Sequence, residues 1–160
     1  MSGLLENKVA IVTGGAKGLG LGISRRLAKD GAKLLITGRD GQATEEVAAQ
    51  IRGEIGTEAI GMSADVGVKE QVEAMIQRAV DEFGGLDILV NNAATLAPNI
   101  PLEQKTDEML RRTLDIALWG SWWGMQAALP HMKARGGGSV INFYSIDAQV
   151  GAWLHADYNI

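Results

Sequence analysis

The sequence predicts an α/β protein built on a doubly wound parallel sheet, and two observations lead to that prediction. Short apolar runs rich in β-branched residues alternate along the chain with longer segments whose apolar residues recur at helical spacing. The short runs contain few polar residues, which is typical of strands that helices cover on both faces. Because parallel strands need crossover connections, we expect one sheet with right-handed crossovers and strand order 3-2-1-4-5.

Each expected element follows from the local pattern. We expect strands at 9–13, 33–37, 59–62, 86–90 and 140–144, and helices at 21–28, 42–52, 69–83 and 107–133. Glycines stop the helices at Gly31, Gly84–Gly85 and Gly136–Gly138. The last residues, 145–160, are expected to form a loop that begins a helix at its end.

The most apolar long stretch, 114–132, is interpreted as a buried helix. Four polar residues interrupt it, Asp115, Ser121, Gln126 and His131, which argues against a membrane span. The N-terminal residues do not form a signal peptide, so a cytoplasmic location is expected.

The amino-acid composition argues against several classes of function. A chain of 160 residues with 46% hydrophobic residues suits one domain with a sizeable core, over residues 1–160. The net charge of −4 offers no basic surface for nucleic acid. Because there is no cysteine and there are only two histidines, neither a disulfide framework nor a metal site is expected.

A glycine-rich turn follows the first strand and opens the first helix. It reads Thr-Gly-x-x-x-Gly-x-Gly, with glycines at Gly14, Gly18 and Gly20. Glycine allows backbone N–H groups to approach a ligand closely, and the helix N-terminus presents unpaired N–H groups and a positive dipole end. The turn therefore predicts a pyrophosphate-binding site, although a purely structural turn stays the alternative for this pattern alone.

Together with later segments, this turn resembles the classical branch of the short-chain dehydrogenase/reductase family. The later segments are Asp65-Val66, Asn91-Asn92-Ala93-Ala94, and a Ser145–Tyr158 pair separated by 13 residues. The resemblance covers roughly residues 7–158 and implies a Rossmann-like fold with ligands at the carboxyl ends of the strands. In the family, Ala94 would be a glycine.

The resemblance implies a nicotinamide dinucleotide. The residues expected to bind it are Gly14, Lys17, Gly18, Leu19, Gly20, Arg39, Asp65, Val66, Asn91, Ala93 and Tyr158. NAD-preferring members usually carry Asp where this chain has Gly38, whereas Arg39 and Lys17 suit a 2′-phosphate, so NADP(H) is the expected cofactor. The alternatives are that Arg39 is a solvated turn residue with Asp40 as ribose partner, and that Asp65 is only a helix N-cap.

The resemblance also assigns the chemistry. It implies that Tyr158 is the general acid/base and that Ser145 polarises the carbonyl oxygen, while the nicotinamide transfers hydride. Two departures stand against it. The family lysine would be residue 162, beyond the last residue, so the C-terminal part of the family fold is expected to be missing. Ala117 replaces the usual helix asparagine, and Ser121 is the candidate to hold a water instead.

The sequence says less about the substrate and the partners than about the cofactor. Gln149, Val150, Trp153, Leu154 and His155, with Leu96 and Ala97, suggest a small apolar alcohol or ketone, with loop packing as the alternative. Trp119, Trp122 and Trp123 suggest core or subunit packing, and the family implies a homo-oligomer.

The expected function is an NADP(H)-dependent oxidoreductase acting on a secondary alcohol or ketone. The alternative is a protein of the same fold that binds dinucleotide without catalysis, as a sensor or assembly partner. An unrelated nucleotide-binding module would leave the Asn-Asn-Ala segment and the Ser–Tyr spacing unexplained.

Overall fold

The fold is a five-stranded parallel sheet with strand order β3-β2-β1-β4-β5, which confirms the predicted order. The computed structural model describes residues 3–95 and 98–159. The strands are β1 (Val9–Thr13), β2 (Lys33–Gly38), β3 (Ala59–Ser63), β4 (Ile88–Asn91) and β5 (Ser139–Asn142). In the register, Ile11 in the central strand lies opposite Leu35 on one side and Leu89 on the other.

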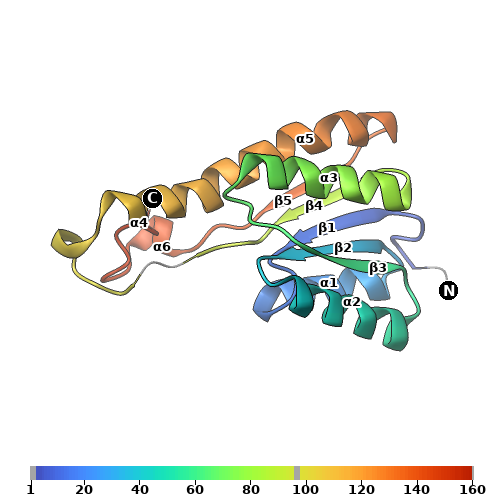
Figure 1. The fold of residues 1–160 in the computed structure, drawn as a ribbon, viewed down its shortest axis with the longest axis horizontal. Helices are drawn as coiled ribbons and strands as arrows, with labels where there is room; N and C mark the ends of the chain where they lie inside the picture. Colours follow the sequence, from blue (N-terminus) through green and yellow to red (C-terminus); the bar gives the residue numbers. More distant parts are fainter. Residues whose placement is uncertain (1–2, 96–97, 160) are drawn as a thin grey trace.

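Helices cover both faces of the sheet (Figure 1). On one face lie α1 (Gly18–Lys29) and α2 (Gly41–Ile55), and on the other lie α3 (Lys69–Phe83) and α5 (Gly120–Ala134). A 3₁₀ turn, η1 (Leu102–Gln104), precedes α4 (Asp107–Leu114), and a π-helical segment, η2 (Asp115–Trp119), joins α4 to α5. In Figure 1, α4 and the short α6 (Asp147–Val150) extend to the left, beyond the carboxyl ends of the strands.

The core has one layer on each side of the sheet, because successive strand residues point to opposite faces. In β1, Val9 and Ile11 join the cluster under α3 and α5, whereas Ala10 and Val12 join the cluster over α1 and α2. All five residues of β1 are buried, as expected for a strand covered on both faces.

Two expectations about burial and boundaries are wrong. The stretch 114–132 is helical but only half buried: Ile116, Gly120, Gly124, Ala128 and Met132 face the core. Its other face exposes apolar side chains, namely Leu118, Trp119, Trp122 and Leu129. The fifth strand ends at Asn142, two residues earlier than expected. It is exposed throughout as the edge strand of the described sheet, where it pairs with β4.

The C-terminal segment also differs from the expectation. The helix expected at its end lies near its start, as α6, and the residues after Val150 form turns up to Asn159. The long helix at 107–133 is confirmed within two residues, but with the π-helical turn inside it. Within the described ranges, no helix is both long enough and apolar enough to cross a bilayer.

Candidate functional site

A cleft of about 580 Å³ opens at the carboxyl ends of β1 to β4. Its wall is formed by the segments that follow these four strands, including the first turns of α1 and α2, and by one residue of η2. The lining residues are Gly14, Ala16–Gly20, Thr37–Asp40, Ala43, Thr44, Ala64–Val66, Asn92–Ala94 and Ile116. The structure thus brings together most of the residues that the sequence predicted for a dinucleotide.

The end of β1 is tied to the end of β4 by one hydroxyl group. Thr13 Oγ1 donates to the Val90 carbonyl at 3.2 Å and accepts from the N–H groups of Asn92 and Ala93, each at 3.0 Å. Asn92 Nδ2 donates in return to the Thr13 carbonyl at 2.8 Å. These bonds hold the floor of the cleft in one geometry.

The glycine turn approaches this floor more closely than any side chain would permit. Gly14 has a φ of +64°, and a Cβ on Gly20 would lie 2.2 Å from the Gly14 carbonyl oxygen and 2.6 Å from Asn92 Nδ2. Gly18, with a φ of +52°, has no atom within 4 Å of the position its Cβ would take. The turn is therefore packed on its inner side and open on its cleft side.

The start of α1 suits an anion. Lys17, the residue before the helix, makes no side-chain cap, and the first turn contains no acidic residue. The first N–H groups of a helix have no partner within the helix and carry the positive end of its dipole. Because glycines leave these groups accessible from the cleft, a pyrophosphate fits here.

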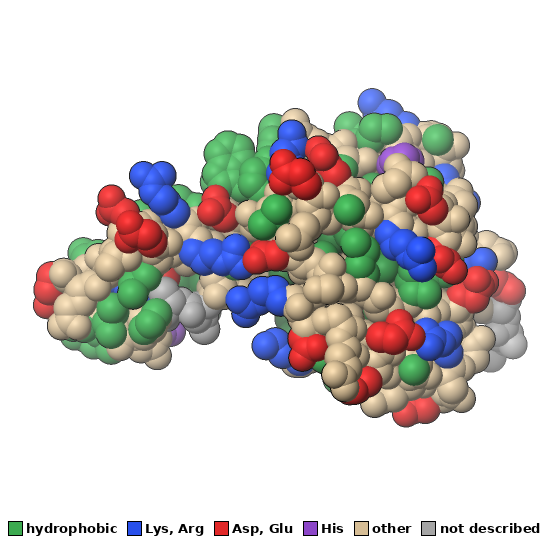
Figure 2. Space-filling model, in the orientation of Figure 1, with side chains coloured by type: hydrophobic (Ala, Val, Ile, Leu, Met, Phe, Trp, Pro, Cys, Tyr) green, Lys and Arg blue, Asp and Glu red, His purple; other side chains and the backbone are tan. Residues whose placement is uncertain are grey.

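Basic side chains lie around the same cleft. Lys17 and Arg39 line it and are exposed. Asp40 caps α2 by accepting from the Ala43 N–H at 3.0 Å, and Ser63 Oγ donates to the Arg39 carbonyl at 3.1 Å. Figure 2 shows Lys and Arg side chains gathered where the part of the molecule formed by α4 and α6 joins the body.

Asp65 forms the opposite wall and is paired with a residue that the sequence analysis did not single out. Its Oδ2 accepts from Arg112 at 2.6 Å and its Oδ1 accepts from the Gly67 N–H at 2.9 Å. Burial opposes ionisation, but these hydrogen bonds and the charges of Arg112 and Arg39 lower the pKa of Asp65. Asp65 is not the N-cap of α3, since that position is Val68.

Of the asparagine pair, only the second residue lines the cleft. Asn91 is buried, and its Nδ2 donates to Asn142 Oδ1 on β5 at 2.8 Å. Asn92 lines the cleft and supports the glycine turn. Asn91 therefore lies behind the cleft wall, and Asn92 is a polar lining residue, like Thr37 and Thr44, that the sequence did not predict for the site.

Ser145 and Tyr158 lie on the segment after β5, and neither lines the cleft. Both are partly buried, and in the described part of the chain no hydrogen bond joins their side chains. Ser145 Oγ accepts from the Asp147 N–H at 3.2 Å. Ala117 lies in the π-helical segment, where its carbonyl accepts from Ser121 Oγ at 2.9 Å.

The expected substrate residues lie on the same segment. Trp153 is 87% exposed, Gln149 Nε2 donates to Tyr144 Oη at 3.0 Å, and His155 Nδ1 lies 3.1 Å from Asp147 Oδ2. Val150 is exposed and Leu154 partly exposed. Leu96 and Ala97 lie outside the described residues.

The match to known sequences decides the family. A sequence model described as short chain dehydrogenase matches residues 8–159. The chain belongs to the short-chain dehydrogenase family. Human dehydrogenase/reductase SDR family member 4 is 38% identical over 156 residues, and galactitol 2-dehydrogenase from Agrobacterium fabrum is 41% identical over 143 residues. These alignments cover 98% and 88% of this chain, and 56% and 54% of the two relatives.

Solved structures with similar sequences have the same fold. L-sorbose reductase from Gluconobacter frateurii, complexed with NADPH and L-sorbose, matches with a TM-score of 0.94 at 32% identity, over 99% of this chain and 60% of that one. An NAD⁺-bound xylitol dehydrogenase matches with a TM-score of 0.90 at 28% identity, over 97% and 59%. The chain spans 51–63% of the length of the curated relatives that it matches.

Proposed function

We propose that this chain forms the cofactor-binding part of an NADP(H)-dependent oxidoreductase that interconverts a small secondary alcohol and a ketone. The observation that carries the proposal is the cleft, where a helix N-terminus with no side-chain cap and no acidic residue in its first turn lies beside two exposed basic side chains, Lys17 and Arg39. Gly14, Gly18, Leu19 and Gly20 would hold the pyrophosphate through backbone N–H groups. Arg39 and Lys17 would hold a 2′-phosphate.

The remaining walls have separate roles. Asp65 and Val66 would flank the adenine, and Ala93, whose N–H is held by Thr13, would line the cofactor, with Asn91 behind the cleft wall. When bound, the nicotinamide supplies hydride transfer. Tyr158 would also contact the cofactor, at its nicotinamide end.

Two side chains of this chain, Tyr158 and Ser145, would act at the substrate oxygen, where the proton is transferred. In the reducing direction, the Tyr158 hydroxyl gives its proton to the carbonyl oxygen, and the Ser145 hydroxyl donates a hydrogen bond to the same oxygen as negative charge develops there. In the oxidising direction, Tyr158 takes the proton back. The sugar and polyol names of two solved relatives support a small alcohol or ketone as the substrate.

The cofactor preference has a direct test. Arg39→Ala should weaken NADPH binding roughly 10-fold or more, since hydrogen bonds between charged groups contribute strongly, while NADH binding changes little. Isothermal titration of both cofactors against the variant measures the difference. Arg25→Ala is the matched control, because Arg25 pairs with Glu54 outside the cleft. Equal losses for NADPH and NADH would reject the 2′-phosphate role.

Turnover separates catalysis from binding alone. Tyr158→Phe and Ser145→Ala should retain NADPH binding and reduce ketone reduction about 100-fold or more. Oxidation of NADPH is followed by absorbance with a panel of apolar ketones and ketoses. Ala117, which replaces the family asparagine, favours the alternative of a dinucleotide-binding protein without catalysis. If the cofactor-bound wild-type chain oxidises no NADPH with any substrate, that alternative holds.

A further inference from the structure

A buried ion pair lies next to the expected catalytic tyrosine. Lys105 Nζ and Asp157 Oδ1 are 2.5 Å apart, and the two side chains are only 6% and 3% exposed. Among the ion pairs in residues 3–95 and 98–159, it is the one in which both side chains are almost fully buried. Asp157 directly precedes Tyr158 in the chain.

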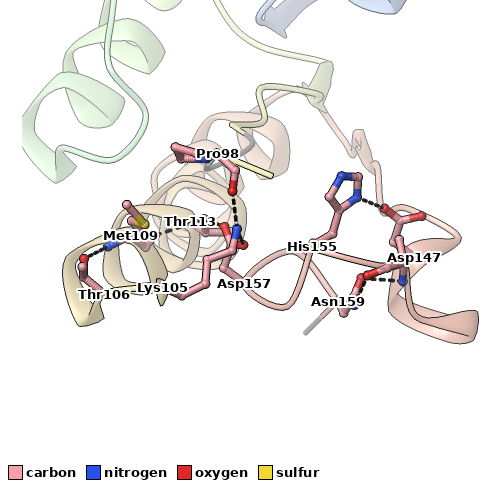
Figure 3. A network of polar contacts seen from close by, with 10 residues as sticks. Pro98, Lys105, Thr106, Met109, Thr113, Asp147, His155, Asp157 and Asn159 are labelled. Carbon is pink, nitrogen blue, oxygen red and sulfur yellow. Dashed lines mark hydrogen bonds and ion pairs between the residues drawn. The ribbon is translucent and has the colours of Figure 1, made fainter. Parts of the chain in front are cut away.

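Further hydrogen bonds complete the pair (Figure 3). Thr113 Oγ1, on α4, donates to the second carboxylate oxygen of Asp157 at 3.2 Å. Lys105 Nζ also donates to the Pro98 carbonyl at 2.7 Å. Lys105, just after η1, and Thr113, on α4, therefore meet the C-terminal segment at the Asp157 carboxylate, and Lys105 also bonds the loop before η1. Burial opposes its ionisation, but the bonds to Lys105 and Thr113 lower the pKa of Asp157.

This arrangement is an inefficient way to gain stability. Two buried charges lose their hydration, and well-packed apolar side chains of the same volume are often equally stabilising. A buried pair does, however, restrict geometry, because only one placement satisfies both charges. The geometry restricted here is that of the turn carrying Tyr158.

The turn itself is closed by local bonds. Tyr158 N–H donates to the His155 carbonyl at 2.8 Å, and Asn159 exchanges two hydrogen bonds with the backbone of Ala152, at 3.1 and 3.0 Å. Because these bonds are internal to the turn, they do not place it against the rest of the molecule. The bonds of Asp157 to Lys105 and Thr113 place the turn against the rest of the molecule.

Helix α4 is also anchored at the cofactor cleft. Arg112, the neighbour of Thr113, binds Asp65 at 2.6 Å. One helix therefore contacts the cleft wall through Arg112 and the Tyr158 turn through Thr113. The two bonds give the tyrosine turn a defined position relative to the cleft.

We propose that Lys105 and Asp157 are positioning residues, which hold the turn carrying Tyr158 against α4 and so set the tyrosine relative to the cofactor cleft. This inference rests on the proposed function for its catalytic consequence. Neither residue touches the reacting atoms in this scheme; both act through Tyr158.

The test is the double variant Lys105→Met/Asp157→Leu, which removes both charges and replaces each side chain by an apolar one of similar branching. We expect a stability close to wild type, unchanged NADPH binding and a kcat reduced roughly 10- to 100-fold, since small misplacements of a catalytic group cost that much. The matched control is Lys33→Met/Glu58→Leu, which removes an exposed ion pair at the start of β2 and should leave kcat unchanged.

A spectroscopic measurement reads the position of Tyr158 without turnover. The chain has two tyrosines, so fluorotyrosine labelling gives two fluorine NMR signals, which Tyr144→Phe assigns. The Tyr158 signal should move or broaden in the double variant and remain in place in the control. If the double variant does not fold, Thr113→Val replaces it, with a smaller change in the same signal.

The outcomes of the two proposals differ. A wild-type Tyr158 signal and a wild-type kcat in the folded double variant would overturn the positioning role. A wild-type chain that shows no turnover rejects the catalytic function, while the fluorine signal still decides whether the ion pair positions the tyrosine.

Discussion

Gly20 and Gly22 lie two residues apart in the first turns of α1, and their surroundings differ completely. A Cβ on Gly20 would lie 2.2 Å from the Gly14 carbonyl oxygen, whereas a Cβ on Gly22 would meet no atom within 4 Å. Glycine at 20 is therefore required by close packing, and glycine at 22 is not. This contrast gives a matched pair of variants.

Gly20→Ala should force the β1–α1 turn apart, lower the free energy of unfolding by about 1–3 kcal/mol and weaken dinucleotide binding. Gly22→Ala should raise the free energy of unfolding by about 0.5–1 kcal/mol, because alanine is the better helix former. Urea denaturation and NADPH titration of both variants measure these effects. Equal behaviour of the two variants would contradict the packing described for the turn.

The two asparagines after β4 show what residue-level patterns predict and what they leave open. The segment Asn91-Asn92-Ala93 was expected beside the cofactor, and it does end at the cleft. Adjacent residues at a strand end point in opposite directions, so a shift of one residue exchanges cleft for core. Only the register of β4 shows that Asn92 lines the cleft while Asn91 bonds Asn142.

At the scale of elements, the outer face of η2 and α5 exposes several large apolar side chains. Leu118, Trp119, Trp122 and Leu129 are exposed, and Trp119 stacks on Trp123 with ring centroids 6.0 Å apart. Trp123 packs against the core, which is one of the two roles expected for the tryptophans of this helix. The exposed apolar side chains suit the second expected role, which is packing against another copy of the chain.

We expect the chain to form a homo-oligomer through this face. Trp122→Glu should shift the assembly toward monomer, because a charge in an apolar interface would be buried without a partner. Sedimentation velocity at several concentrations measures the shift. Leu4→Glu, at a residue that is 89% exposed far from α5 in sequence, is the control and should change nothing. A wild-type chain that stays monomeric at all concentrations would refute the expectation.

The long helix was predictable as an element, but its interior was not. Apolar spacing located residues 107–133 as helical, and the structure agrees within two residues. The π-helical turn at Asp115–Trp119 has no distinct apolar period, so spacing could not reveal it. Likewise, the fifth strand has the apolar residues of a buried strand, but the structure leaves it exposed. Whether a strand is buried depends on which elements pack against it.

At the scale of the whole molecule, buried or half-buried carboxylates join distant parts of the chain. Asp87, with its side chain 4% exposed, accepts from Arg135 Nε at 3.1 Å and from the Val9 N–H at 2.9 Å, and Arg135 Nη2 lies 3.0 Å from its second oxygen. Burial opposes ionisation, but the hydrogen bonds and charge of Arg135, with the Val9 N–H and Lys8, lower the pKa of Asp87. The pKa values of Asp65 and Asp157 are lowered in the same sense.

These shifts predict how stability depends on pH. A carboxylate whose pKa is lower in the folded state stabilises the fold at pH values above its unfolded pKa, about 3.9. The contribution is lost as the pH falls below that value through the folded pKa. Urea midpoints between pH 7 and pH 3 should therefore fall mainly below about pH 4. Asp87→Asn should lower the free energy of unfolding at pH 7 by about 1–3 kcal/mol, and its urea midpoint should fall less steeply than that of the wild type below about pH 4. An equally steep fall would contradict the lowered pKa of Asp87.

The sequence by itself determined the α/β class, the strand order and the glycine turn, because strand and helix periods and glycine conformations are local properties of the chain. It also placed most cleft residues, since the carboxyl ends of parallel strands converge at one edge of a sheet. Only the tertiary structure decided the pairing of Asp65 with Arg112 and of Asp157 with Lys105, 47 and 52 residues apart in the chain. Such pairs form between segments with no local signal for each other, because side-chain contacts depend on how the elements pack rather than on their spacing in sequence.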